Sequence, residues 1–194
     1  RRVMGEIIAK GYCQALLAGN ALATHDLEGG YLGTALGCDI VDQKQHFMGH
    51  YNHLDTINAI NTYESIPAFI ENEGIRSGII YNCVKNDVPF VLNGSIRDDG
   101  PLPEVLEDNY VGQDTIRSHI RKATVVVLHT IAAGNMTPTY RVLSDGTVRP
   151  IYFYMVDTSE FAANKLGDRG SLAAKGIVTN VQDFMRNLSA GLDL

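Results

Sequence analysis

An α/β fold, with a mostly parallel sheet covered by helices on both faces, is predicted by two features of the sequence. Short apolar runs, typical of buried strands, each end in a polar residue. Helix-like segments follow three of these runs and a charged loop follows the fourth, an alternation typical of parallel sheets. The polar residues that end the four runs are Asn20, Asn93, Asp157 and Asn180. Because ligands bind outside the carboxyl ends of such strands, we expect these four side chains to gather along one edge of the sheet.

The amino-terminal segment is expected to contain a helix, a strand and a second helix. Residues 1–11 have the apolar spacing of an amphipathic helix that is entered midway. The apolar run 15–18 predicts a strand, and the small residues after it predict a helix over 21–28. Because the chain opens on Arg1, with no initiator methionine and no signal peptide, we expect it to be the carboxyl-terminal part of a larger protein.

Residues 42–53 hold three histidines in polar surroundings, and we expect a loop there. His46 and His50 are four residues apart, which is the spacing of a metal-binding pair on a helix. Gly49 interrupts that pattern and no carboxylate partner is evident, so a solvated or substrate-facing loop is the favoured interpretation. No metal is expected.

The middle of the chain is organised around a strand that leads into a charged loop. Residues 88–93 are largely apolar and predict a buried strand. The loop over 94–103 carries the polar side chains Ser95, Arg97, Asp98 and Asp99. Such a junction is how open α/β sheets build ligand sites, although Asp-Asp-Gly-Pro is also ordinary turn chemistry.

The remaining segments predict alternating helices and strands. Helices are expected over 54–63, 66–73 and 102–122. Residues 123–128 are a strand or a buried helix, between which periodicity does not decide. The elements expected after them are a hairpin over 140–150, a strand over 151–156, a helix over 159–166, a strand over 176–179 and a helix over 181–188.

The composition excludes several classes of protein. The net charge of −6 argues against binding to nucleic acid or to an anionic membrane, and no apolar run is long enough to span a bilayer. Cys13, Cys38 and Cys83 are an odd number without metal-type spacing, as expected for reduced thiols of a cytoplasmic protein.

Asp157 is the most interpretable single residue. A carboxylate directly after a strand can accept hydrogen bonds from ribose hydroxyls and favours NAD over NADP, but it also suits the N-cap of the following helix. The corners Gly19-Asn20 and Gly134-Asn135 would let a cofactor approach the backbone closely. The sequence contains neither the G-x-G-x-x-G fingerprint nor a Walker loop. The residues alone therefore indicate an α/β ligand-binding domain, with a nucleotide as the favoured ligand.

Several segments together resemble one family of carboxyl-terminal domains. They are residues 17–26, 78–86, 89–103, 129–135, 165–171 and 176–179. The family is that of the proteins labelled lysine-oxoglutarate reductase/saccharopine dehydrogenase enzymes. It includes the archaeal NAD-dependent ornithine cyclodeaminases and the ornithine cyclodeaminase half of arginine dihydrolase fusions. The resemblance implies a Rossmann-like, deoxyhypusine-synthase-like fold without the usual glycine fingerprint, in which residues 1–194 form one NAD-binding catalytic domain.

The resemblance also implies a set of site residues. NAD is expected to contact Asn20, Ala21, Asp99, Ala133, Gly134, Asn135, Met136, Asp157, Asn180 and Val181, with Asp157 at the ribose. Arg97 is the candidate for gripping the substrate carboxylate, because a guanidinium binds a carboxylate through two parallel hydrogen bonds. Asp98 and His25 are the candidates for proton transfer.

The implied reaction is the redox-neutral conversion of L-ornithine to L-proline and ammonia. A hydride moves from Cα to NAD⁺, the δ-amine attacks the resulting imine, ammonia leaves, and the hydride returns to the cyclic imine. A saccharopine-type NAD(P) oxidoreductase and a non-catalytic NAD-sensing domain are the alternatives. The expected partners are a small amino-acid substrate and further copies of the chain, with neither nucleic acid nor membrane.

Overall fold

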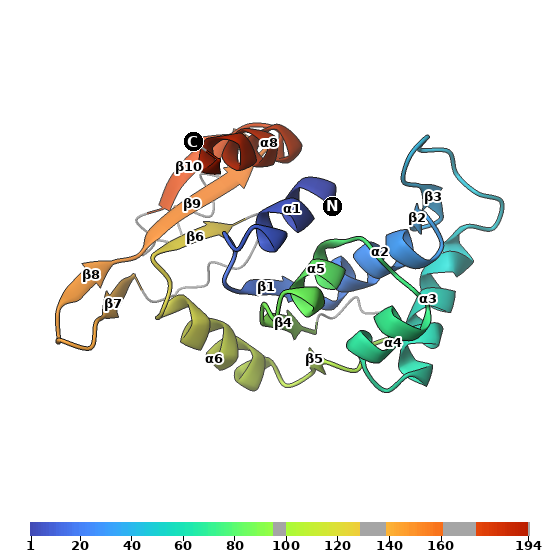
Figure 1. Cartoon of the computed structure of the whole chain (residues 1–194), viewed down its shortest axis with the longest axis horizontal. Helices are drawn as coiled ribbons and strands as arrows, with labels where there is room; N and C mark the ends of the chain where they lie inside the picture. The colour runs from blue at the N-terminus through green and yellow to red at the C-terminus, as the bar shows by residue number, and fades with distance from the viewer. Residues whose placement is uncertain (95–99, 129–138, 161–173, 194) are drawn as a thin grey trace. The chain divides into compact units, whose positions relative to one another are not determined.

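The computed structural model describes residues 1–94, 100–128, 139–160 and 174–193. They form two compact units, Arg1–Gln113 and Asp114–Leu194, which are described separately. Figure 1 shows the order of the elements along the chain by colour. No helix among these residues is long and apolar enough to cross a membrane.

The first unit is built around a three-stranded parallel sheet in the order β1-β4-β5. Its strands are β1 (Leu16–Gly19), β4 (Phe90–Asn93) and β5 (Val105–Leu106). Its helices are α1 (Arg2–Ala9), α2 (Asn20–Tyr31), α3 (His50–Thr62), α4 (Ile66–Asn72) and α5 (Ile79–Lys85). A short antiparallel pair, β2 (Thr34–Ala35) and β3 (Cys38–Asp39), lies between α2 and α3 in the chain. In the register of the sheet Gly19 pairs with Asn93, so the ends of β1 and β4 lie side by side.

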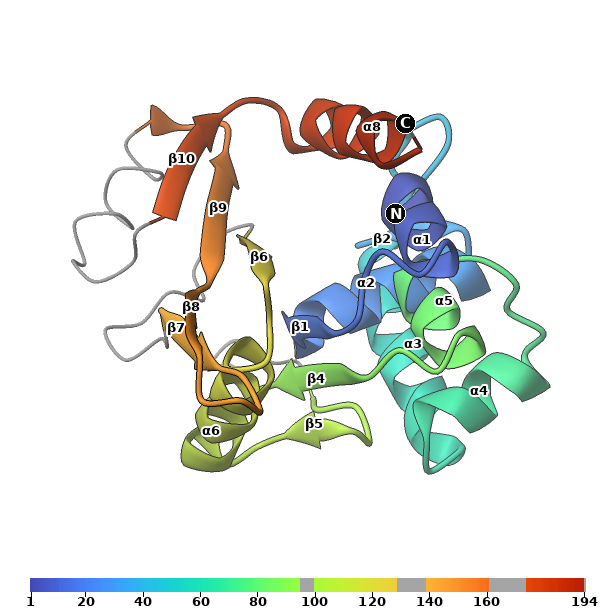
Figure 2. The same cartoon turned by 60° about the vertical axis from the view of Figure 1, so that its left-hand side comes forward.

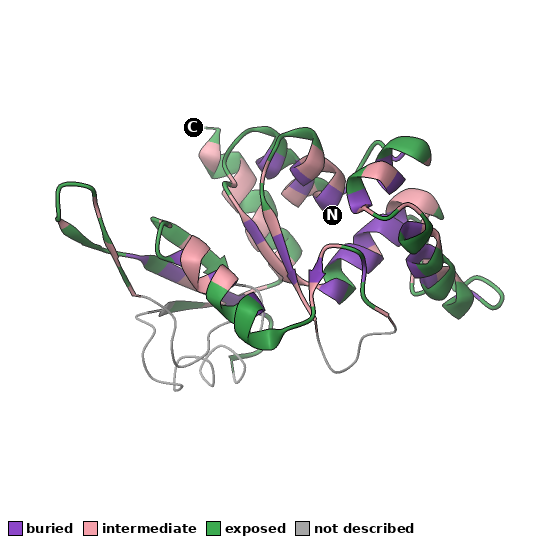
Figure 3. Ribbon diagram, turned by 90° about the horizontal axis from the view of Figure 1, so that it is seen from below, coloured by how far each residue is buried: buried purple, intermediate pink, exposed green. Residues whose placement is uncertain are grey.

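The core of the first unit is formed where these helices meet the sheet. Its most deeply buried side chains include Ile8, Leu27, Ile60, Phe69 and Leu92. Buried residues, purple in Figure 3, lie on the strands and on the inner helix faces. The central helix α2 is buried along much of its length, polar residues included, so every polar side chain on its inner faces needs a partner within the protein.

The second unit contains another three-stranded parallel sheet, in the order β10-β9-β6 (Figure 2). Its strands are β6 (Val125–Leu128), β9 (Tyr152–Asp157) and β10 (Ala174–Val178). The antiparallel hairpin of β7 (Tyr140–Val142) and β8 (Val148–Pro150) precedes β9, and α8 (Val181–Leu192) follows β10. Helix α6 (Asn109–Ile120) runs from the first unit into the second.

The predicted α/β class is confirmed, and parallel strands account for both three-stranded sheets. The strand over 151–156, the hairpin over 140–150 and the helix over 181–188 are all present, and residues 125–128 form a strand rather than a helix. Of the four polar strand-end residues, Asn20 and Asn93 lie at one sheet and Asp157 and Asn180 at the other. The helix expected over 159–166 lies largely outside the described residues.

Two boundaries differ from the prediction. The histidine-rich segment is a loop only as far as Gly49, because α3 begins at His50, and the residue interpreted as an interruption is the helix boundary. The helix expected from residue 102 begins instead at Asn109, after β5. The side chain of Asp108 explains this start, since its Oδ1 accepts hydrogen bonds from the backbone N–H groups of Tyr110 and Val111, in the manner of an N-cap.

Candidate functional site

The junction of β1 and α2 places Gly19, Asn20 and Ala21 at the carboxyl edge of the first sheet. Asn20 is only 3% exposed, and both ends of its amide are used. Its Nδ2 donates to the carbonyl of Gly100 at 2.9 Å, and its Oδ1 accepts from the N–H of Leu102 at 3.1 Å. The side chain thus fastens the end of the charged loop to the start of α2. We therefore assign Asn20 a loop-holding role in addition to the predicted place beside a cofactor.

Beside this junction an acceptor atom is enclosed at the end of β4. Oδ1 of Asn93 is buried and has no hydrogen-bond partner among the described residues. Gly112 lies so close to this amide that a Cβ atom at position 112 would overlap it. A buried acceptor oxygen normally receives a hydrogen bond. Because Asn93 lies at the sheet edge where ligands of α/β folds bind, a bound ligand could donate that hydrogen bond.

One face of α2 leads from this edge into the interior. Ala21, His25 and Glu28 are spaced by four and three residues, so their side chains lie along one side of the helix. Ala21 is exposed, His25 is half-buried and Glu28 is completely buried. His25, which the sequence singled out for proton transfer, therefore lies between the surface and a buried carboxylate.

Glu28 accepts four hydrogen bonds. The hydroxyl of Thr34 and the N–H of Gly37 donate to its Oε1 at 2.6 and 2.9 Å. The N–H of Leu36 lies 3.0 Å and Nδ1 of His53 lies 3.3 Å from its Oε2. Burial alone would raise the pKa of Glu28, but these hydrogen bonds together outweigh it and hold the pKa below its ordinary value. Glu28 is therefore a buried, charged carboxylate.

His53 reaches Glu28 from α3, and its ring also lies against His25. The centroids of the two imidazole rings are 4.9 Å apart and the rings are tilted by 37°. His53 is 7% exposed. Sequence reasoning missed both Glu28 and His53, because 25 residues separate them and no periodicity links them. The one local signal was the i, i+3 spacing of His25 and Glu28 on a predicted helix.

His25, Glu28 and His53 also form a group that could hold a metal ion. One ligand atom from each lies within 4.8 Å of the others. However, the two carboxylate oxygens of Glu28 already accept two hydrogen bonds each, which uses the acceptor positions that an ion would need. The i, i+4 pair His46 and His50, which the sequence analysis did not favour as a metal site, does not share a helix, since His46 precedes α3.

In the second unit Asp157 ends β9 and is 8% exposed. Its Oδ1 accepts from the N–H of Ser159 at 2.8 Å, a local contact of the Asx-turn type. This bond uses one carboxylate oxygen. The first helical residue after it is Glu160, so Asp157 does not occupy the N-cap position that the sequence offered as an alternative. Its position at the sheet edge is compatible with the ribose interpretation.

Asn180 and Val181 lie at the start of α8, directly after the strand that pairs with β9. Asn180 is exposed, and its Oδ1 accepts from the N–H of Gln182 at 2.9 Å, so it caps the helix. The other predicted site residues lie outside the described residues: Arg97, Asp98, Asp99, Ala133, Gly134, Asn135 and Met136.

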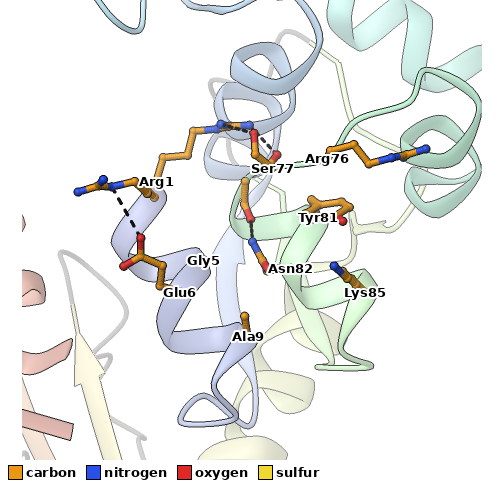
Figure 4. Close-up of a pocket in the computed structure, with 11 residues that line it drawn as sticks. Arg1, Gly5, Glu6, Ala9, Arg76, Ser77, Tyr81, Asn82 and Lys85 are labelled. Carbon is orange, nitrogen blue, oxygen red and sulfur yellow. Dashed lines mark hydrogen bonds and ion pairs between the residues drawn. The ribbon is translucent and has the colours of Figure 1, made fainter. Parts of the chain in front are cut away.

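A cavity of about 470 Å³ lies elsewhere in the first unit, between α1 and α5 (Figure 4). Four cationic side chains line it, namely Arg1, Arg2, Arg76 and Lys85. Arg1 is anchored, because its Nε lies 3.0 Å from Oδ1 of Asp26 and its guanidinium donates to the carbonyl and hydroxyl of Ser77. None of the described residues that the sequence assigned to the site lines this cavity.

Parallel strands followed by helices, with polar side chains at the carboxyl edges, define an α/β protein of the Rossmann class. Residues 1–188 match the family model described as arginine dihydrolase ArgZ-like, C-terminal, Rossmann fold. The chain belongs to this family.

Named relatives agree with this assignment. The chain is 44% identical over 188 residues to the ornithine cyclodeaminase of Methanothermobacter thermautotrophicus, which covers 94% of this chain and 43% of the relative. It is 40% identical over 195 residues to the bifunctional arginine dihydrolase/ornithine cyclodeaminase AgrE of Nostoc, which covers 98% of this chain and 26% of the relative. The chain thus spans less than half the length of these relatives.

Two solved structures share the fold. A conserved putative LOR/SDH protein from Methanococcus maripaludis has a TM-score of 0.87 at 40% identity, over 98% of this chain and 55% of that one. The ternary complex of AgrE with ornithine and NAD⁺ has a TM-score of 0.83 at 38% identity, over 98% of this chain and 27% of that one.

Proposed function

We propose that the protein containing this chain is an NAD-dependent ornithine cyclodeaminase that converts L-ornithine to L-proline and ammonia. The observation that carries the proposal is the likeness to AgrE, whose solved complex holds ornithine and NAD⁺ and whose fold extends over 98% of this chain. The relatives named ornithine cyclodeaminase support the same activity.

Features at the sheet edge of each unit, taken separately, support the proposed cofactor. The first has a glycine at a strand-to-helix corner and the enclosed acceptor of Asn93, and the second has the buried carboxylate of Asp157. When bound, NAD⁺ supplies a reversible hydride acceptor. The residues proposed to hold it are Asn20, Ala21, Asp99, Ala133, Gly134, Asn135, Met136, Asp157, Asn180 and Val181, with Asp157 accepting hydrogen bonds from the ribose.

The protein's own groups then have to bind an amino acid and move protons. Ornithine with two ammonium groups becomes proline and ammonium with no net release of a proton, so protons must be carried from one nitrogen atom to another. We assign this transfer to His25 and Asp98, and the grip on the substrate carboxylate to Arg97. Of these three, His25 lies among the described residues, next to a buried carboxylate that would stabilise the positive charge it gains.

The test uses the longest available form of the protein. It is incubated with ornithine and catalytic amounts of NAD⁺, proline and ammonia are quantified, and NADH is followed by absorbance. Equal amounts of proline and ammonia without accumulation of NADH are expected. Asp157→Ala should weaken NAD binding at least about tenfold by loss of the charge-assisted ribose contacts, while Asp145→Ala, in the exposed turn of the hairpin, should leave it unchanged.

Other outcomes would contradict the proposal in different ways. Net oxidation of the substrate with stoichiometric NADH would indicate a saccharopine-type oxidoreductase. Tight NAD binding without turnover of ornithine would indicate an NAD-sensing domain. Asp157→Ala with unchanged NAD affinity would contradict the ribose role of Asp157.

A further inference from the structure

The buried carboxylate of Glu28 determines how the ring of His53 is protonated. A charged carboxylate only accepts hydrogen bonds, so the ring nitrogen that faces it, Nδ1 of His53 at 3.3 Å, must be the donor. When the ring is neutral, the other nitrogen, Nε2, carries the lone pair. The hydroxyl of Thr34 and the N–H groups of Leu36 and Gly37 keep the carboxylate itself from rotating.

The oriented ring of His53 in turn supports His25. The two rings lie 4.9 Å apart, and a nitrogen of His25, a nitrogen of His53 and an oxygen of Glu28 all lie within 4.8 Å of one another. His25 is the outer member of the group, one turn of α2 beyond Ala21, and the other two are buried. A negative charge at this distance in a buried site favours a positive charge on the imidazole that exchanges protons with a ligand.

We propose that His25, His53 and Glu28 form one proton-transfer group, in which His25 contacts the substrate and the other two are positioning residues. His53 fixes the plane of the His25 ring, and Glu28 fixes the tautomer of His53 and stabilises the imidazolium formed on His25. This inference rests on the proposed function, because the substrate amines of that reaction are what His25 would serve.

The proton bookkeeping of this group is closed. An N–H bond of the substrate α-ammonium breaks as an N–H bond forms on His25. That proton later leaves His25 and forms an N–H bond on the departing α-nitrogen, so His25 returns to its first state. The proton that the δ-ammonium loses before its attack passes to solvent and is regained by the proline nitrogen, so both protons are accounted for. No oxidant, reductant or external proton is required, and a carboxylate behind an imidazole performs the same positioning task in hydrolytic triads.

The central test compares the same substitution at two histidines of α3. His53→Asn keeps a donor where Nδ1 lies but removes the rest of the ring that contacts His25. His50→Asn changes an exposed histidine at the first turn of the same helix. We expect His53→Asn to lower kcat at least about 100-fold, the range measured for general acid–base groups, with little change in the KM for ornithine or in NAD affinity. His50→Asn is expected to retain the activity of the unaltered protein.

A second pair of variants tests the carboxylate. Glu28→Gln is expected to lower kcat and to move the ring proton of His53 from Nδ1 to Nε2, because the new amide donates where the carboxylate accepted. Nitrogen-15 NMR of the histidine side chains reads this tautomer directly, without turnover. Glu104→Gln is the matched control, since Glu104 also caps a backbone N–H, that of Ile66, but lies outside the group.

The outcomes separate this inference from the proposed function. If the unaltered protein binds NAD but does not turn over ornithine, the proposed function is contradicted, and so is the catalytic role of His25. Active unaltered protein together with an equally active His53→Asn variant overturns only the inference. If the purified protein contains a stoichiometric amount of bound metal and the His53→Asn variant does not, the proposed proton-transfer group is also overturned. The three residues would then form a metal site.

Discussion

At the scale of single residues, the three cysteines differ in their surroundings more than the sequence indicates. Burial raises the pKa of Cys83 to about 12, and burial also raises the pKa of Cys13. Cys38 is half-buried and its Sγ donates to the carbonyl of Gln43. The reactive species is the thiolate. At pH 8 a thiol with this pKa is ionised in on the order of one molecule in 10,000, so Cys83 is almost entirely in the unreactive thiol form.

We therefore predict an order of alkylation in the native protein. Cys38 should react first with iodoacetamide, Cys13 more slowly, and Cys83 only after unfolding. Peptide mass spectrometry at timed intervals measures the three rates, and the same experiment in 6 M guanidinium is the control in which all three should react alike. Early labelling of Cys83 in the native state would show that its side chain is accessible.

The residues that sequence reasoning could and could not find differ in a physical way. Asn20 and Asp157 were found because each stands at a strand end, a position that local pattern reveals, whereas His25 was named only through the family resemblance. Glu28 and His53 were missed because a buried carboxylate gains its partners only when α3 packs on α2. Asn20 was found for its place, but its bonds to Gly100 and Leu102 cross 80 or more residues and are invisible in sequence.

At the scale of elements, the segment between α2 and α3 depends on two glycines with left-handed backbone. Gly33 has a φ of +73° with nothing within 4 Å of an added Cβ. Gly37 has a φ of +70°, and its Cβ would overlap the backbone of Gly49. This close approach brings the N–H of Gly37 to Glu28 and the end of the loop to the start of α3.

Substitution of alanine at Gly33 and at Gly37 distinguishes the energetic cost of a left-handed backbone from the cost of steric overlap with Gly49. Gly33→Ala should cost only the left-handed conformation, about 1–2 kcal/mol of unfolding free energy. Gly37→Ala carries the same cost and also forces the two backbone segments apart, so we expect clearly greater destabilisation and faster alkylation of the neighbouring Cys38. Urea denaturation followed by circular dichroism measures both; equal losses would contradict the crowding at Gly37.

Element boundaries were less predictable than element types. Strand β1 and helix α2 follow from an apolar run and the small residues after it, and both were predicted. The late start of α6 was missed, because the apolar pattern continues through β5 and only the contacts of the Asp108 side chain mark where the helix begins. Gly49 was interpreted as an interruption of a helical histidine pattern, although it adjoins the first turn of α3.

At the scale of the whole molecule, the hydrogen bonds of Glu28 link stability to pH. The pKa of Glu28 in the folded chain lies below its ordinary value of 4.5. The contribution of ionised Glu28 to the free energy of unfolding is therefore fully present above about pH 4.5, and it is lost as the pH falls through the pKa of Glu28 in the folded chain. Because the carboxylate connects α2, α3 and the β2–β3 segment, its protonation loosens several elements together.

We predict that the stability difference between the unaltered protein and Glu28→Gln shrinks on acidification. At pH 7 the variant should be less stable by about 1–3 kcal/mol, the range for a buried group that loses hydrogen bonds to a charged partner. Below the folded pKa the two proteins should converge. Urea midpoints from circular dichroism between pH 3 and 7 measure this, since the chain has no tryptophan. A difference that stays constant with pH would contradict a charged Glu28.

The carboxylate of Glu28 also has a consequence for how the protein tolerates mutation. Because one side chain anchors a loop and orients His53, its replacement should reduce both the amount of protein in a cell and the turnover of each molecule. Replacement of His25, which is half-buried, should reduce turnover and leave abundance nearly intact. A mutational scan that scores abundance and activity separately should therefore find that substitutions of Glu28 lower both scores, whereas substitutions of His25 lower activity alone. Substitutions that change activity without loss of folded protein are therefore expected at His25 rather than at Glu28.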